Sequence, residues 1–166
     1  MATLIKRSQI QAFLNTAGKG KEPIYKIVGN YMPTGAYDYN PQTTTETYIV
    51  NDNATSTLDS YQIAFDGEMK CAKGDAVFDY IDGLRYNVAV GDDAVSEVVL
   101  VDTYEQKGSS GGFRAQKFAC TVSINSFGGD GGQIATISFN IAVNRDPVQG
   151  TATISDGTCS FTAELQ

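Results

Sequence analysis

The fold of this chain is decided by the stretch from Phe113 to Phe127, which reads FRAQKFACTVSINSF in one-letter code. Apolar side chains recur in it at every second position, at Phe118, Cys120, Val122 and Ile124. Most of the positions between them are polar, at Lys117, Thr121, Ser123 and Asn125. Because successive side chains of a strand point to opposite faces of its sheet, this stretch predicts a long antiparallel strand with one buried face and one wet face.

The same pattern continues on both sides of this strand. Further strands are predicted over 24–32, 61–70, 97–105 and 134–143, and a closing hairpin is predicted over 151–154 and 158–163. Glycine-rich or proline-containing segments separate them, most clearly Phe127–Gln133 and Asp146–Gly150, which we interpret as turns. The sequence therefore predicts a mainly β, antiparallel sandwich.

One helix interrupts the strands, over about Asp75 to Asn87. Asp75 is well placed as its N-cap, because a carboxylate there accepts hydrogen bonds from free backbone amides. Its buried stripe is expected to consist of Val77, Phe78, Ile81 and Leu84. Asp75, Asp79 and Asp82 share another face, but Arg85 is spaced to pair with Asp82, so we expect a solvated face or a subunit contact there and no metal site.

The composition excludes several kinds of catalytic site. The 166 residues include no histidine, which removes Ser–His–Asp and Cys–His chemistry and histidine-bound zinc. Cys71, Cys120 and Cys159 lie far apart in strand-like surroundings, so they are expected to be reduced thiols in the core. We expect neither an enzyme nor a bound cofactor or metal.

Charge divides the chain into two parts. Residues 1–26 carry a net charge of +4, whereas residues 27–166 carry −11. We interpret residues 1–23 as an N-terminal arm, either mobile or docked on a neighbouring acidic body, and residues 24–166 as a single domain. The acidic domain is unsuited to tight binding of nucleic acid, because phosphates are repelled. No apolar run is long enough to cross a membrane, and Lys6-Arg7 directly after Leu4-Ile5 leaves no secretory signal, so we expect folding in the cytosol.

A polar excursion follows the first strand. Within it, residues 51–58 are expected to form a long loop between two paired strands, and long ordered loops are frequently functional. The residues of this loop are Asn51, Asp52, Asn53, Ala54, Thr55, Ser56, Thr57 and Leu58.

Several short segments, taken together and in order, resemble the major tail tube proteins of long-tailed bacteriophages, which have siphovirus-like tails. The resemblance covers roughly residues 24–163, and the N-terminal arm carries little of it. The segments are Ser60-Tyr61, Cys71-Ala72-Lys73-Gly74-Asp75, Phe78-Asp79-Tyr80-Ile81, Leu84-Arg85, Gly91-Asp92-Asp93-Ala94, Arg114-Ala115-Gln116-Lys117, Phe127-Gly128-Gly129-Asp130-Gly131-Gly132 and Asp146-Pro147-Val148-Gln149-Gly150-Thr151.

The resemblance implies a β-sandwich with one flanking helix, related to the tube of type VI secretion systems. It implies a homo-hexameric ring whose sheets join into a continuous inner β-barrel, and rings that stack into the virion's tail tube. DNA leaves through the lumen without specific binding, and a tape measure protein and a tail terminator are the implied partners. The loop at 51–58 matches the loop that bridges stacked rings. Asp66 and Glu68, on the polar face of the strand over 61–70, are lumen candidates, although Lys70 and Lys117 lie on comparable faces.

Other functions stay open at this point. A carbohydrate-binding β-sandwich could use Tyr37, Tyr39 and Tyr48 as stacking platforms, although the chain has no tryptophan. A hydrolase with paired carboxylates is a second alternative. A tube subunit of a contractile tail, a tailocin or a secretion system is a third, and the sequence does not separate it from the tube of a non-contractile tail.

Overall fold

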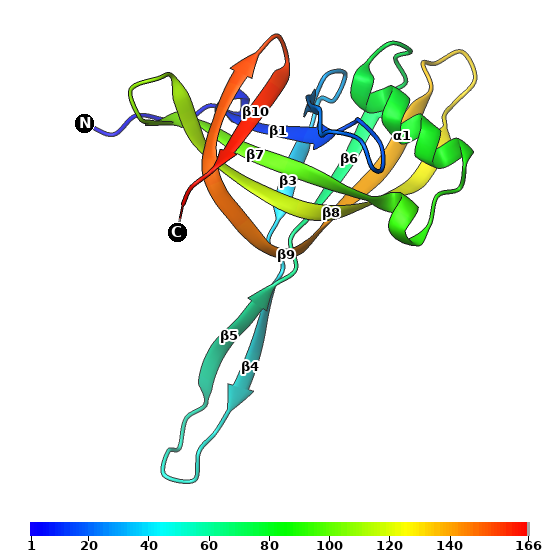
Figure 1. Ribbon diagram of the computed structural model, residues 1–166. Helices are drawn as coiled ribbons and strands as arrows, with labels where there is room; N and C mark the ends of the chain where they lie inside the picture. Colours follow the sequence, from blue (N-terminus) through cyan, green and yellow to red (C-terminus); the bar gives the residue numbers. More distant parts are fainter. Residues whose placement is uncertain (166) are drawn as a thin grey trace.

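The computed structural model describes residues 1–165 and consists mainly of antiparallel strands (Figure 1). The strands are β1 (Ile10–Asn15), β2 (Tyr25–Val28), β3 (Gly35–Asp38), β4 (Pro41–Glu46), β5 (Thr55–Tyr61), β6 (Ala64–Lys70), β7 (Val95–Lys107), β8 (Gly112–Gly128), β9 (Thr136–Ser155) and β10 (Thr158–Ala163). The helices are α1 (Ala76–Tyr86) and two 3-10 turns, η1 (Arg7–Gln9) and η2 (Gly91–Ala94). The predicted mainly antiparallel β fold with one flanking α-helix is confirmed.

Eight of the strands form one sheet in the order β10-β2-β1-β7-β8-β9-β6-β3, and β10 also pairs with β9. That extra pairing closes six strands, from β9 through β10, β2, β1 and β7 to β8, into a barrel. The other halves of β8 and β9 extend beyond the barrel, where β9 pairs with β6 and β6 pairs with β3. We call this four-stranded part, β3-β6-β9-β8, the open extension. The two layers of the expected sandwich are therefore parts of one curved sheet.

The prediction of a turn at Asp146–Gly150 is wrong. These residues belong to β9, which runs through them without reversing direction. The pairing of β8 with β9 shifts register between Lys117 and Ala119, opposite this segment. Arg145 there has a φ of 63°, which is unusual for a residue with a side chain. The proline and the irregular backbone bend the strand at a bulge, and this bend carries β9 from the open extension into the barrel.

The predicted N-terminal arm over residues 1–23 is corrected at residues 10–15. These residues form β1, which lies between β2 and β7 and pairs with both. Phe13 and Leu14 are fully buried on opposite faces of the strand. A central strand buried on both faces shows no alternation of apolar and polar residues, so the sequence pattern does not reveal β1.

The helix begins and ends almost where the sequence predicts. Asp75 is its N-cap, and its carboxylate accepts hydrogen bonds from the backbone amides of Val77 and Phe78 at 3.1 and 3.0 Å. Asn87 is the C-cap. Val77, Phe78 and Ile81 are buried against the sheet, and Leu84 packs at the edge of the same cluster. Within the described residues, no helix is long and apolar enough to span a membrane.

Two apolar cores lie on opposite faces of β7. Val98 and Leu100 face α1 and the open extension, where Phe118, Phe139 and Ile141 complete the larger core. Val99 and Val101 face the inside of the barrel. The apolar run Val98–Val101 is thus explained by burial on both faces.

The larger core supplies a test of the fold. Replacing Ile81, which is fully buried, with alanine should lower the free energy of unfolding by about 2–5 kcal/mol, because it leaves a cavity under α1. Ile49→Ala is the matched control, since Ile49 is fully exposed and should change stability by less than about 0.5 kcal/mol. Urea unfolding of both variants measures the difference, and equal losses would show that α1 is not packed as described.

Candidate assembly surfaces

The most prominent surface is a hairpin that projects from the body (Figure 1). β4 and β5 pair from Pro41 opposite Tyr61 to Glu46 opposite Thr55, and almost every residue of both strands is exposed. The expected loop at 51–58 is corrected accordingly. Thr55, Ser56, Thr57 and Leu58 belong to β5, whereas Asn51, Asp52, Asn53 and Ala54 lie in the turn at the tip. Threonine favours extended backbone, but with neither face buried the strand gives no alternating pattern.

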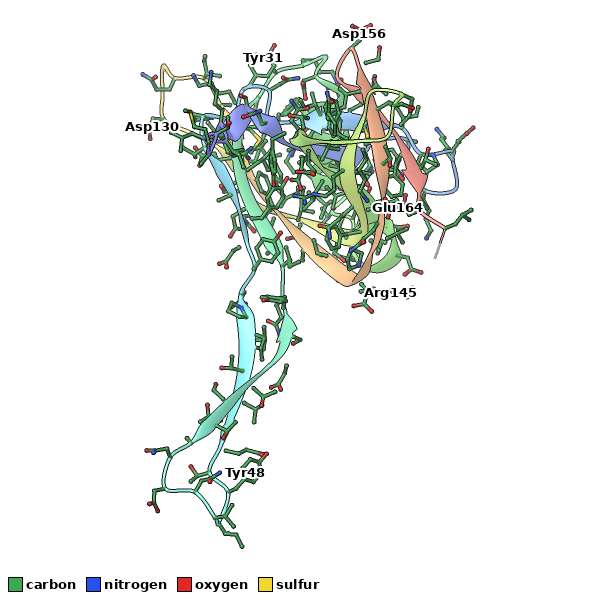
Figure 2. The ribbon with its side chains drawn as sticks, turned by 90° about the vertical axis from the view of Figure 1, so that its left-hand side faces the viewer. Tyr31, Tyr48, Asp130, Arg145, Asp156 and Glu164 are labelled. Carbon is green, nitrogen blue, oxygen red and sulfur yellow. The ribbon has the colours of Figure 1, made fainter. Side chains whose placement is uncertain are left out.

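The tip of the hairpin is apolar and acidic. Tyr48, Ile49 and Val50 expose 55%, 104% and 83% of their surface, and Figure 2 shows Tyr48 far from the body. The chain has no lysine or arginine between Lys26 and Lys70, so the hairpin carries only negative charges. A two-stranded ribbon without a core is marginally stable alone, and exposed apolar side chains mark contact sites. The hairpin therefore has the features of a segment that is buried against a partner.

The open extension has two free edges. β3 pairs with β6 alone among the described strands. At the other end, the pairing of β7 with β8 stops at Thr121, whereas β8 continues along β9 to Gly128. Residues 35–38 and 122–127 therefore lack a neighbouring strand on opposite sides of the same sheet, although the carbonyl oxygen of Gly35 accepts a hydrogen bond from Arg7. Such edges readily pair with another chain.

The polar face of this extension carries both lumen candidates. Asp66 and Glu68 are exposed on β6, and they accept hydrogen bonds from Asn140 and Ser138 of β9 at 2.7 and 3.2 Å. Lys70 is exposed at the end of the same strand. Lys117 belongs to a different environment, because its ammonium lies 5.5 Å from the ring of Phe161. The structure thus brings the two carboxylates together on one wet face.

The three acidic side chains at and near α1 stabilise the local structure. Asp75 caps α1, Asp79 pairs with Lys73 at 3.0 Å, and the predicted pair of Asp82 with Arg85 is confirmed at 2.8 Å. The hydrogen bond from Lys73 holds the pKa of Asp79 below its usual range. Among the described residues, no group of three or more acidic or cysteine side chains is arranged to hold a metal ion.

The three tyrosines of the carbohydrate hypothesis do not form one platform. Tyr37 packs on Phe65, with 5.2 Å between ring centroids. Tyr39 packs edge-on against Tyr61 at the base of the hairpin, and Tyr48 lies near its tip (Figure 2). Stacking on a sugar ring requires open, neighbouring aromatic faces, and this arrangement does not supply them.

β3 lies in the segment that the sequence predicts to be a polar excursion. Tyr37 is half-buried, whereas Ala36 and Asp38 are exposed, which is the alternation of a strand, but four residues are too few to show it in the sequence. Gly35 is needed there because a Cβ would lie 2.8 Å from the ring of Phe65.

The three cysteines allow a direct test of the described burial. Cys120 and Cys159 are buried, which raises their pKa values to about 12 and about 11, and Cys71 is partly exposed with a pKa raised by desolvation. Because the thiolate is the reactive form, we expect a thiol reagent at pH 8 to label Cys71 slowly and the other two only after unfolding. Labelling followed by mass spectrometry measures this. Rapid labelling of Cys120 in the native protein would contradict the fold.

No family model and no curated protein matches the sequence. Similarity appears among solved structures. A chain from the tail of an empty GTA particle, determined with C6 symmetry, superposes with a TM-score of 0.61 at 12% identity, over 96% of this chain and 100% of that one. A chain of an extracellular contractile injection system, described as the PVC sheath/tube terminator in its extended state, gives a TM-score of 0.52 at 10% identity over 90% and 98%.

The chain has the fold of tail and injection-system subunits. At these identities the likeness concerns the fold alone, and it extends over nearly the whole of each chain compared. The projecting hairpin and the two free edges are features of this chain's own residues.

Proposed function

We propose that this chain is a structural subunit of a phage tail tube, in which hexameric rings stack into a hollow conduit for the genome. The observation that carries the proposal is the pair of free edges on one sheet, in a fold shared with a tail determined with C6 symmetry. A sheet with two complementary edges generates a closed ring when copies are related by rotation.

In the proposed ring, residues 35–38 of each copy pair with residues 122–127 of the next. The open extensions then join into one barrel, and every edge is covered. The face that carries Asp66 and Glu68 is proposed to line the lumen. On this face the carboxylates of Asp66 and Glu68 outnumber the single cation of β6, Lys70, so phosphates are repelled on balance and DNA passes without adhering.

The hairpin is proposed to bridge successive rings. It extends beyond the body, and it exposes an apolar tip that a contact with the next ring would bury (Figure 1). Asn51 to Ala54 at the tip and Thr55 to Leu58 in β5 would then both contribute to stacking.

The proposal places the protein in the virion tail after assembly in the host cytoplasm. A tape measure protein in the lumen and a tail terminator at the tube's end are its expected partners. We expect no catalytic activity, since the reactive arrangements that histidine supports are excluded and the acidic residues serve as caps, ion pairs and polar surface.

A second candidate is the tube of a contractile system. The likeness to the terminator chain of a contractile injection system favours it. Both candidates use the same subunit fold and the same ring, and they differ in whether a sheath surrounds the tube.

Shortening the hairpin tests the stacking role. A variant in which Asn-Gly replaces residues 47–54 should keep its fold, because the tip contributes no residue to either core, and a two-residue Asn-Gly turn suits paired strands. We expect the unmodified protein to form tubes in negative-stain electron microscopy, and the variant to stop at single rings.

A full-length variant separates the effect of the apolar side chains at the tip from the effect of the length of the hairpin. Replacing Tyr48, Ile49 and Val50 together with serine keeps the hairpin but removes its apolar surface, and should also reduce tube growth. Tubes of normal length from the shortened variant would refute the bridging role, and an unmodified protein that stays monomeric at high concentration would refute the tube function.

A further inference from the structure

A groove runs along the barrel side of β3. It consists of two adjoining hollows of about 760 and 980 Å³ that share Arg7, Ile10 and Gly35 in their walls. Arg7 lies between them, where its guanidinium donates hydrogen bonds to the carbonyl oxygens of Gly35 and Ile10 and so ties β3 to the start of β1. The groove therefore has a fixed floor directly beside one of the two free edges.

Basic side chains gather in the smaller hollow of the groove. The smaller hollow is lined by Arg7, Lys107 and Arg114 against one carboxylate, that of Asp102. Arg114 pairs with Asp102 at 2.7 Å and Lys107 pairs with Glu164, so among the described residues Arg7 is the cation of this hollow that has no ion-pair partner. The larger hollow also contains the carboxylate of Asp66, so the free positive charge of the groove is that of Arg7.

Two unpaired polar atoms border the same groove. Among the described residues, the buried side-chain atoms without a hydrogen-bond partner are the Tyr37 hydroxyl, which borders the smaller hollow, and Gln11 Oε1, which borders the larger. An unsatisfied buried polar group is unfavourable, and such groups are rare in proteins. One on each half of the groove gives an occupant two polar atoms with which it can form hydrogen bonds.

A second segment, beside the other free edge, exposes apolar side chains. Residues 86–95, from the end of α1 to the start of β7, expose Tyr86, Val88 and Val90 to 78%, 78% and 74%. The same segment carries Asp92 and Asp93 and no lysine or arginine; Asp93 pairs with Lys19 at 3.4 Å, which leaves Asp92 without an ion-pair partner among the described residues. It combines apolar side chains with negative charge.

This segment lies beside the other free edge. Arg85 at the end of α1 stacks on Phe127 of the free part of β8, 4.1 Å from the ring centroid, and η2 contacts β8 as well. In Figure 1 the end of α1 and its connection to β7 lie on the right of the molecule, whereas β3 lies nearer the middle, behind β7. The groove and the segment thus each flank a different edge of the open extension.

We propose that residues 86–95 of one copy seat in the groove beside β3 of the next copy in the ring. The inference rests on the proposed function, because it extends the pairing of edges to side chains on the barrel side of the sheet. In this arrangement the paired edges bring the segment and the groove together, with the carboxylate of Asp92 towards the guanidinium of Arg7. Apolar contact and opposite charge then select the correct neighbour.

Photo-crosslinking tests directly whether residues 86–95 lie in the groove of the neighbouring copy. The photoreactive residue p-benzoylphenylalanine replaces Val90 in one variant and Ile134, an exposed apolar residue of the β8–β9 connection, in a control. Both proteins are assembled, irradiated and analysed by mass spectrometry. We expect links between copies from position 90 to fall within residues 7–11, 35–39 and 100–116, and those from position 134 to fall elsewhere.

Charge reversal supplies a second readout. Asp92→Lys should lower the yield of rings at least tenfold, whereas Asp130→Lys, an equal charge change at another exposed carboxylate, should leave it within twofold. Thermal unfolding of both monomers should match the unmodified protein. Tubes in which position 90 links outside the groove, or normal ring yield from Asp92→Lys, would overturn this inference and leave the tube function standing. Absence of rings from the unmodified protein would overturn both.

Discussion

An open sheet edge is costly to leave exposed, and this constraint governs the rest of the structure. The chain covers one side of its sheet completely, because β10 returns to β9 and closes the barrel. The other side keeps residues 35–38 and 122–127 unpaired. In a monomer such edges invite aggregation, whereas in a ring each edge covers another. A fold that closes at one end and stays open at the other is therefore suited to assembly.

The closed part gives the open part its rigidity. β8 and β9 run without interruption from the barrel into the extension, and β7 is buried on both faces between the two cores. The free edge of β8 is thus held in position by strands whose other halves are fixed elsewhere. The helix packs on the extension from the same side as the barrel, which leaves the opposite face wet and available to line a channel.

Sequence reasoning succeeded where a local pattern coincides with a local structure. Asp75 caps α1 and the apolar stripe of Val77, Phe78 and Ile81 is buried, so the helix was placed to within about one residue. The pair of Asp82 with Arg85 followed from helical spacing alone. The alternation in β6 and β8 gave strands, and the acidic pair on β6 was found on one face for the same reason.

It failed where burial does not alternate or where distant segments meet. β1 is buried on both faces, and its residues were predicted to belong to an N-terminal arm. β5 is buried on neither face, and part of it was predicted to be a loop. Pro147 suggested a turn, but the chain bends there within a strand. The groove beside β3 joins residues near positions 7, 37 and 114, and no local pattern connects them.

The central claim is that the two free edges pair between copies, and hydrogen–deuterium exchange measures this most directly. Amides of residues 35–38 and 122–127 should exchange rapidly in the monomer and become protected on assembly, while the amides of β1 and β7 stay protected in both states. Equal exchange of the two edges before and after assembly would contradict the account, because the copies would then be held together by some other surface.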